Sequence, residues 1–267
     1  MLENKLLIMG IINITPDSFS DGGLYLDPES SLRRAISCIN DGANILDLGA
    51  QSTRPGADYI SEDIEVMRLL PCLKKIRSGL PNSIISIDTF HSKVAKSSLE
   101  HGANLINDIS GGRYDKDMAK LIADAGCNYV ITHSRGNSKT MNSLAVYKDV
   151  VNEVFQELLK LTDHAISNGV QPNQIIWDPG LGFAKNNEHN LTILRNLEKF
   201  TSEQFPVLLG PSRKRFIGHV LNEENPNKRI YGTSAVVCRC IDAKVDMVRV
   251  HDVYEISQVI SMSSQIW

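Results

Sequence analysis

The sequence predicts one α/β domain over residues 1–267, in which eight parallel strands close into a (β/α)8 barrel wrapped by helices. Eight short apolar runs recur along the chain, each ends in a polar or charged residue, and helical patterns separate them. The length of 267 residues suits one such barrel, which takes roughly 250 residues. Because all the strands of a barrel end on one face, these observations predict the fold and the place of its functional site together.

The strand candidates are nearly continuous in Val, Ile and Leu, as expected for a parallel sheet that is covered on both sides. Their ends lie about 20 to 45 residues apart, which leaves room for one crossover helix each. In order, the candidates are Leu6–Asn13, Ile45–Asp47, Ile84–Asp88, Leu105–Asp108, Tyr129–His133, Ile175–Asp178, Val207–Gly210 with Ser212 just beyond it, and Val248–His251.

Apolar residues at helical spacing predict helices between the strands, for example at Ser31–Asn40, Ile64–Ile76 and Val150–Ile166. An open, doubly wound sheet is the alternative arrangement of the same elements. No GxGxxG motif follows the first strand, and polar residues follow all the strands instead of gathering at one switch point. We therefore expect the closed barrel.

The composition is that of an ordinary globular chain, with 42% hydrophobic and 22% charged residues and a formal net charge of -3. No basic run is present, so binding to nucleic acid is not expected. No apolar stretch reaches the ~18 residues that a membrane-spanning helix needs. Met1–Lys5 lack the pattern of a signal peptide. We therefore expect a cytoplasmic protein that does not bind membranes.

The five cysteines are an odd number and lack CxxC spacing, which argues against a disulfide framework and against a zinc site. Cys238 and Cys240 lie two residues apart in an expected helix and so point in different directions. We expect the thiols to be small buried side chains.

Two connections are longer and more polar than a simple turn requires. Thr15–Leu26 follows the first strand and is rich in Asp, Ser and Gly, and Ser52–Tyr59 follows the second strand. Such loops on a rigid barrel usually carry binding groups or close over a ligand, although plain linkers remain the alternative.

The residues expected at the mouth of the barrel, the face at the carboxyl ends of the strands, fall into two chemical sets. Cations suit an anion with several oxygens, such as a diphosphate. Buried carboxylates suit a planar heterocycle with adjacent N–H donors. We therefore expect one substrate that carries both an anionic group and such a heterocycle. We also expect the two sets of residues to lie on separate parts of the mouth. The cations are Arg54, Lys214, Arg249 and His251; the carboxylates are Asp88 and Asp178; the amides are Asn13 and Asn107.

Each of these residues also has a structural alternative, because a strand-end Asp can cap the next helix and a lone His can be a core residue. The motifs GxSxG, HExxH and GxxxxGK[ST] are absent from the sequence, and Asp17 and Asp21 lack the other ligands of an EF-hand. Neither a covalent nucleophile nor a tight zinc site is therefore expected. For His133 we expect an orienting or structural role.

The same residues occur in stretches that resemble the dihydropteroate synthase family, the folate-pathway enzymes that sulfonamides target. The stretches run from the first strand to the last, so the resemblance covers the whole chain. They are Met9–Gly23, Ser52–Ala57, Ser86–Thr89, Ile106–Gly112, Asp178–Phe183, Ser212–Lys214 and Arg249–Val253.

The resemblance implies a TIM barrel enzyme that joins 6-hydroxymethyl-7,8-dihydropterin diphosphate to p-aminobenzoate and releases diphosphate. Catalytic roles are implied for Asp88, Lys214, Arg54, Arg249 and His251. The implied pterin-binding residues are Asp88, Asn107, Asp178 and Lys214, and the diphosphate-binding residues are Asn13, Arg54, Arg249 and His251. The implied p-aminobenzoate pocket consists of Thr53, Pro55, Phe183, Ser212 and Lys214. Asn13 would also contact a Mg²⁺ that is bound mostly through phosphate oxygens.

Several positions depart from the usual family pattern. Ala50 and Gln51 stand where Gly and Glu are usual, Ala184 replaces a common Gly, and Thr132–Gly136 differs from the usual methionine-containing run. None of these departures removes an implied site residue.

Two rival functions share the fold: a pterin-binding paralogue without activity, and a barrel that passes a methyl group from a folate to a corrinoid. The retained Thr53–Pro55 loop and the pair Arg249 and His251 favour the synthase over both. The resemblance also implies a homodimer through the later helices, in which the apolar segment Ala235–Ala243 could serve the interface or the core.

Overall fold

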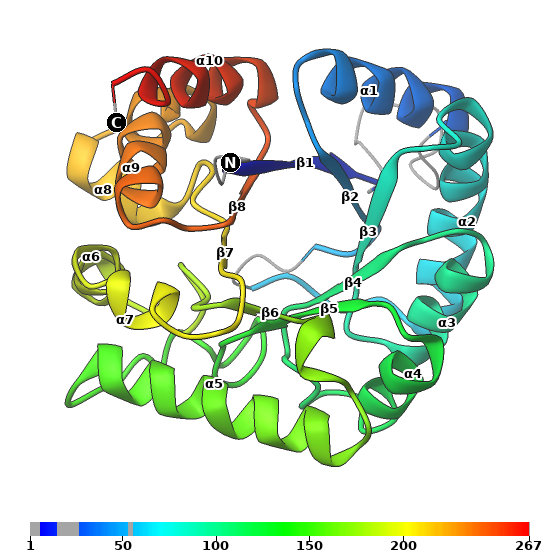
Figure 1. Ribbon diagram of the computed structural model, residues 1–267, viewed down its shortest axis with the longest axis horizontal. Helices are drawn as coiled ribbons and strands as arrows, with labels where there is room; N and C mark the ends of the chain where they lie inside the picture. Colours follow the sequence, from blue (N-terminus) through cyan, green and yellow to red (C-terminus); the bar gives the residue numbers. More distant parts are fainter. Residues whose placement is uncertain (1–5, 15–26, 53–55, 267) are drawn as a thin grey trace.

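The computed structural model describes residues 6–14, 27–52 and 56–266, and it shows a ring of parallel strands surrounded by helices (Figure 1). The strands alternate with helices along the chain. They are β1 (Leu7–Asn13), β2 (Ile45–Gly49), β3 (Ile84–Asp88), β4 (Leu105–Asp108), β5 (Asn128–Thr132), β6 (Ile175–Asp178), β7 (Leu208–Leu209) and β8 (Met247–Val250).

The sheet runs in the order β6-β5-β4-β3-β2-β1-β8-β7, and all its paired strands are parallel. A further parallel bridge between Trp177 and Val207 joins β6 to the start of β7, at the two ends of that order. The predicted barrel is therefore confirmed over the open sheet. β7 is shorter than predicted and β2 continues two residues beyond Asp47, which places Asp47 inside a strand.

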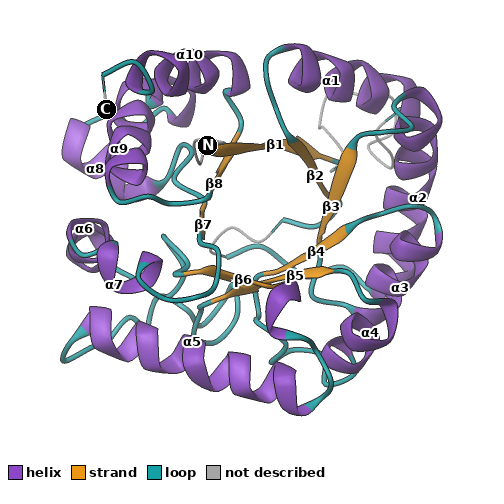
Figure 2. Cartoon of the chain, viewed as in Figure 1, coloured by secondary structure: helices purple, strands orange, loops and turns teal. Residues whose placement is uncertain are grey.

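The helices lie on the outside of the ring (Figure 2). In chain order they are α1 (Pro28–Asn40), α2 (Glu62–Gly79), α3 (Ser92–Glu100), α4 (Met118–Ala125), α5 (Val150–Ser167), α6 (Asn187–Arg195), α7 (Glu198–Thr201), α8 (Arg215–Leu221), α9 (Ile230–Asp242) and α10 (Val253–Ser263), with short 3₁₀ turns at Pro172–Gln174 and Pro226–Lys228.

The first two helices begin earlier than the apolar pattern predicts. The Asp27 carboxylate accepts hydrogen bonds from the amides of Glu29 and Ser30, and Pro28 occupies the first helical turn. The Ser61 hydroxyl caps α2 in the same way. Because a polar cap and a first-turn proline precede the apolar stripe, periodicity alone places such helix starts too late.

The core has two layers that the strands separate. The outer faces of the strands pack against the helices, and the inner faces meet in a small apolar cluster that we call the floor. The floor consists of Met9, Ile45, Leu105, Val130, Ile176, Leu208 and Met247. Because side chains alternate along a strand, the residue two positions after each floor residue also points inward, one layer nearer the mouth.

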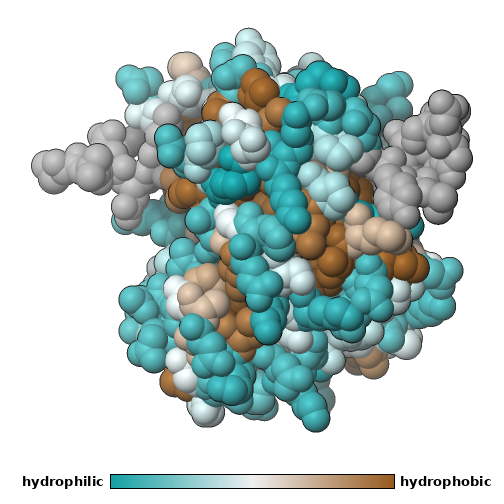
Figure 3. Space-filling view, turned by 90° about the vertical axis from the view of Figure 1, so that its right-hand side faces the viewer, coloured by the Kyte–Doolittle hydropathy of each residue, from teal (hydrophilic) through white to brown (hydrophobic). Residues whose placement is uncertain are grey.

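The surface over the side that carries α1 to α4 is mostly hydrophilic with apolar patches (Figure 3). In the described part of the chain, no helix is both long and apolar enough to span a bilayer. The five cysteines are free thiols; Cys38, Cys72 and Cys240 are buried as expected, whereas Cys127 and Cys238 are partly exposed. In the segment Ala235–Ala243, Val237 and Cys240 belong to the core.

Candidate active site

Most side chains of the layer directly above the floor are polar, and we call these polar residues the inner wall. Its members come from six strands: Asp47, Asp88, Asn107, Thr132, Asp178 and Arg249. Each except Arg249 is less than a tenth exposed. Four of the predicted site residues are therefore brought together here by strand alternation. Asp47 and Thr132 are additional members that were not predicted for the site.

Arg249 lies between two carboxylates of the inner wall. Its Nε donates to Asp47 Oδ2 at 2.6 Å, and its Nη2 donates to Asp88 Oδ2 at 2.6 Å. The expected separation of cations from carboxylates is therefore wrong at this point. The reason is physical: two buried carboxylates side by side need a positive charge between them.

Some acceptors of the inner wall have no partner within the described residues. These include Asp47 Oδ1 and Asp88 Oδ1. Burial raises the pKa of Asp88 to about 6, against the opposing effect of Arg249. An unpaired buried carboxylate oxygen is costly, so these atoms are suited to accept hydrogen bonds from a ligand.

Asp178, Lys214 and Phe183 lie on the β6 and β7 side. Asp178 Oδ1 accepts a hydrogen bond from the Gly180 amide at 2.7 Å, and burial raises the pKa of this carboxyl. Lys214 Nζ lies 4.4 Å from the centre of the Phe183 ring. Burial lowers the pKa of Lys214 to about 8, although Asp178 and Asp88 favour its charged form. Gly182, at φ +80°, leaves the space that the Lys214 side chain needs, because a Cβ there would approach its Cδ to 3.2 Å.

Ser212 and His251 contact each other at the end of β8. Ser212 Oγ lies 2.9 Å from His251 Nδ1 and accepts a hydrogen bond from the His251 amide at 3.1 Å. The sequence assigned these two residues to different ligands, whereas the structure places them side by side. Asn13 is exposed at the carboxyl end of β1.

Thr53, Arg54 and Pro55 lie outside the described residues, as does the whole of Thr15–Leu26. The residues after Pro55 are held by the connection that follows β5. The Gly56 amide donates to Ser138 O at 2.9 Å, and Ser138 Oγ donates to Ala57 O at 2.7 Å. On the other side, Gln51 Oε1 accepts from the Ile60 amide at 2.8 Å, so the unusual Gln51 also holds this loop.

A second buried polar group, the His133 cluster, lies behind β5 and β6, against α5. It consists of His133, Lys185, Glu157 and Arg135. His133 Nδ1 lies 2.8 Å from Lys185 Nζ, and His133 Nε2 lies 2.9 Å from Glu157 Oε2. Arg135 also pairs with Glu157. Burial lowers the pKa of His133 to about 3, with a further contribution from Lys185.

The His133 imidazole is thus neutral, accepts at Nδ1 and donates at Nε2. Such an arrangement orients side chains and does not form a nucleophile–base pair. This fits the orienting or structural role expected for His133. No pattern in the sequence points to the partners Lys185 and Glu157, because they come from distant segments.

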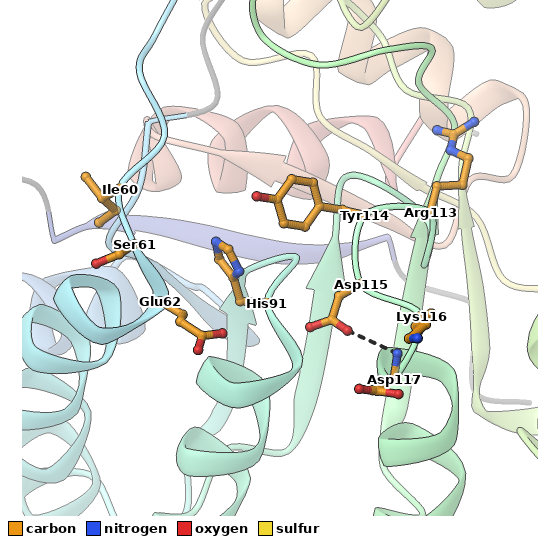
Figure 4. A pocket seen from close by; sticks show the side chains of 9 residues that line it. All are labelled: Ile60, Ser61, Glu62, His91, Arg113, Tyr114, Asp115, Lys116 and Asp117. Carbon is orange, nitrogen blue, oxygen red and sulfur yellow. Dashed lines mark hydrogen bonds between the residues drawn. The ribbon is translucent and has the colours of Figure 1, made fainter.

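A surface pocket lies beside the mouth, not over the inner wall. It has a volume of about 620 Å³ and is lined by residues of the connections after β2, β3 and β4 (Figure 4). His91 and Tyr114 meet edge to face in it, with ring centres 5.1 Å apart. Its described lining includes no predicted site residue. A smaller cavity of about 200 Å³ is lined in part by Phe183 and Arg113.

Comparison with known proteins decides which chemistry this geometry serves. The sequence profile of the family described as pterin binding enzyme matches residues 9–251. The chain belongs to this family. It is 42% identical over 263 residues to the dihydropteroate synthase of Synechocystis sp.. The match covers 98% of this chain and 91% of that protein.

Solved structures of dihydropteroate synthases are also similar to this chain. The enzyme from Clostridium difficile, solved in the presence of pteroic acid, is 39% identical, and the match covers 98% of this chain and 97% of that one with a TM-score of 0.91. The enzyme from Thermus thermophilus in complex with 6HMPPP is 34% identical, covers 98% and 94% of the two chains, and has a TM-score of 0.84. The resemblance stated from the sequence is confirmed, and with it the dihydropteroate synthase activity. The roles of individual residues remain predictions.

Proposed function

We propose that the inner wall holds the pterin while the chain condenses 6-hydroxymethyl-7,8-dihydropterin diphosphate with p-aminobenzoate to give 7,8-dihydropteroate and diphosphate. The observation that carries this proposal is the set of buried acceptors directly above the apolar floor, on Asp88, Asn107 and Asp178. A carboxylate accepts two parallel hydrogen bonds from a ring N–H and an adjacent amino group. The floor supplies the apolar surface below such a ring.

Lys214 supports the same placement. Its ammonium lies over the Phe183 ring, and the charges of Asp178 and Asp88 favour its charged form. A donor at this position can hydrogen-bond the acceptor atoms of the pterin ring, while the carboxylates accept hydrogen bonds from the N–H groups of the ring. The pterin would thereby be held by complementary donors and acceptors along its edge.

The diphosphate belongs, in this proposal, towards the open end of the mouth, where Arg249 of the inner wall would bind it together with Arg54, His251 and Asn13. Positive side chains there stabilise the charge that develops on the leaving diphosphate as the C–O bond breaks. Arg249 would do so from a fixed position, because Asp47 and Asp88 already orient its guanidinium. Asp88 would offset the positive charge that spreads into the pterin ring.

The arylamine then attacks the methylene carbon. It is a neutral nucleophile that needs positioning more than a strong base, which agrees with a site built from orienting contacts. We propose that Thr53, Pro55, Phe183, Ser212 and Lys214 line the p-aminobenzoate pocket. Of these, Phe183 and Lys214 are in contact, and Ser212 adjoins His251.

Mg²⁺ fits the donor set at this end. In the described part of the chain, no group of three or more His, Cys, Asp or Glu side chains could hold a metal ion. Mg²⁺ typically binds through substrate phosphates and waters with few protein ligands, so Asn13 as a single amide ligand is consistent with it. When bound, the ion would neutralise part of the diphosphate charge.

Two wider expectations remain proposals. Exposed apolar side chains on α8, α9 and α10, among them Val220, Tyr231 and Met262, support a homodimer through the later helices. Free thiols are consistent with a reducing compartment and hence with the cytoplasm. Light scattering of the purified chain would test the dimer.

One assay tests the proposed reaction. The protein is incubated with the pterin diphosphate, Mg²⁺ and p-aminobenzoate, and dihydropteroate and free diphosphate are measured. We expect both products in equal amounts. Binding of the pterin without turnover would instead support the inactive paralogue and contradict the proposal.

A further inference from the structure

The Thr132 hydroxyl is a polar atom of the inner wall that the assignments above leave without a role. Thr132 ends β5 and is 1% exposed. Its Oγ1 has no hydrogen-bond partner within the described part of the chain. An unpaired buried hydroxyl costs about 1–3 kcal/mol, and such groups in folded proteins call for an explanation.

The side chain of Thr132 points into the barrel. Val130, two residues earlier, belongs to the floor, and His133, the next residue, contacts Glu157 of α5 on the outside. Because side chains alternate along a strand, Thr132 must face the interior with Val130. The hydroxyl therefore lies in the same layer as the predicted pterin-binding residues.

The strands on either side of β5 supply two of those residues. Thr132 is directly opposite Asp178 in the pairing of β5 with β6. In the pairing of β4 with β5, Asn107 is opposite Val130. Thr132 thus has Asp178 beside it on β6, whereas Asn107 on β4 lies one inward-facing position nearer the floor.

We propose that Thr132 is a specificity-determining residue whose hydroxyl hydrogen-bonds the amino-pyrimidine edge of the pterin, next to Asp178. This inference rests on the proposed placement of the pterin against the inner wall. A hydroxyl donates one hydrogen bond and accepts others, so it suits an edge where a ring nitrogen and an amino group are adjacent. The contact gives β5 a part in substrate recognition.

Loss of the Thr132 hydroxyl should affect ligand binding but not folding. Thr132→Val removes the hydroxyl, keeps the shape of the side chain and retains a residue that favours strands. Because the hydroxyl has no partner among residues 6–14, 27–52 and 56–266, the variant should melt at the same temperature as the parent or higher. Its affinity for the pterin should fall about three- to tenfold, the value of one ordinary hydrogen bond.

The test is calorimetric titration of 6-hydroxymethylpterin into the parent, Thr132→Val, Thr132→Ser and Ser98→Ala, together with a melting curve of each. Ser98 is a matched control, because its hydroxyl is also buried and has no partner in the described part of the structure, but it belongs to α3, outside the barrel. We expect Thr132→Ser and Ser98→Ala to bind like the parent. In turnover, Thr132→Val should raise the KM for the pterin substrate and leave the KM for p-aminobenzoate unchanged.

Parent-like binding by Thr132→Val overturns the inference, and so does a loss of affinity that is accompanied by a lower melting temperature. Asp178→Asn in the same series separates this failure from that of the proposed site. If Asp178→Asn binds weakly while Thr132→Val binds normally, the inference about Thr132 alone is wrong. If Asp178→Asn binds normally, the placement of the pterin is itself wrong.

Discussion

The inner wall lies inside the barrel and the His133 cluster lies behind β5 and β6, and these two groups of polar side chains differ in how completely they are paired. In the His133 cluster, both ring nitrogens of His133 and both oxygens of Glu157 have partners. In the inner wall, Asp47 Oδ1, Asp88 Oδ1 and Thr132 Oγ1 have none among the described residues. In these two groups, complete pairing accompanies a role in the scaffold, and incomplete pairing inside the barrel leaves polar atoms that a ligand can pair.

The largest expected effect is on activity, from Asp88→Asn in the inner wall. The change removes the charge that faces the pterin and weakens the hold on Arg249, so kcat/KM should fall by about 10²–10³-fold. The melting temperature should change little, because the buried carboxylate is itself costly and Arg249 keeps Asp47. Steady-state kinetics and a melting curve measure the two effects. Parent-like activity would remove Asp88 from the site.

The reverse pattern is expected for His133→Asn in the second cluster. It leaves the Lys185 ammonium and Glu157 short of a partner in a buried place, which should destabilise the protein by about 2–4 kcal/mol. Once folded, the variant should keep kcat/KM within about threefold of the parent, because the cluster lies outside the barrel. Urea unfolding measures the loss. His101→Asn, at the end of α3, is the matched control, and a large loss of activity in His133→Asn without a loss of stability would contradict the comparison.

The contributions of the two regions to the pH dependence of stability should have opposite signs. The pKa of His133 falls to about 3 on folding, so the unfolded chain binds more protons below its ordinary pKa of 6.5, and stability rises with pH in that window. The pKa of Asp88 rises from 3.8 to about 6, so stability falls with pH between those values. His133→Asn should therefore flatten the rise of the unfolding free energy between pH 4 and 6, and Asp88→Asn should steepen it, each by up to about 1.4 kcal/mol per pH unit.

Urea unfolding at pH 4, 5 and 6 measures these slopes in the parent and both variants. Slopes that change in the same direction in the two variants would show that the regions do not differ in the way the pairing indicates.

The smallest effect concerns Asp108, the carboxylate next to Asn107 on β4. Its Oδ2 accepts from Tyr129 Oη and the Gly112 amide, each at 2.8 Å, and its Oδ1 accepts from the Ser110 amide at 2.7 Å. Because Asp108 is fully paired, it should behave as scaffold in spite of its position. Tyr129→Phe should cost about 1 kcal/mol of stability and leave kcat/KM unchanged. Urea unfolding and steady-state kinetics check this together. A loss of activity without a loss of stability would show that Asp108 belongs to the site.

The sequence was a good guide to the fold and to the strand ends. Strands β3, β4 and β6 have the predicted bounds, because each apolar run stops where the first loop residue begins. It was a poorer guide to which residues point inward. Asp47 was taken as the end of a run, whereas β2 continues to Gly49 and turns Asp47 into the partner of Arg249.

Pairing between distant segments also could not be predicted. Lys185 and Glu157 meet His133 from a loop and a helix, and no spacing in the sequence links the three residues. The sequence likewise identifies Arg249 as a cation at the mouth, but only the fold shows that two carboxylates orient it. The types of residue at the site can thus be read from short stretches of sequence, whereas the partners of these residues become known only from the fold.

Calorimetric titration of 6-hydroxymethylpterin into the parent, Asp178→Asn and His133→Asn at one pH tests the distinction between the two regions most directly. Asp178→Asn should weaken binding by about 10²-fold or more, because it loses charged hydrogen bonds to the ring. His133→Asn should bind within about threefold of the parent. Normal binding by Asp178→Asn, or a loss confined to His133→Asn, would contradict the assignment of the inner wall to the ligand and of the His133 cluster to the scaffold.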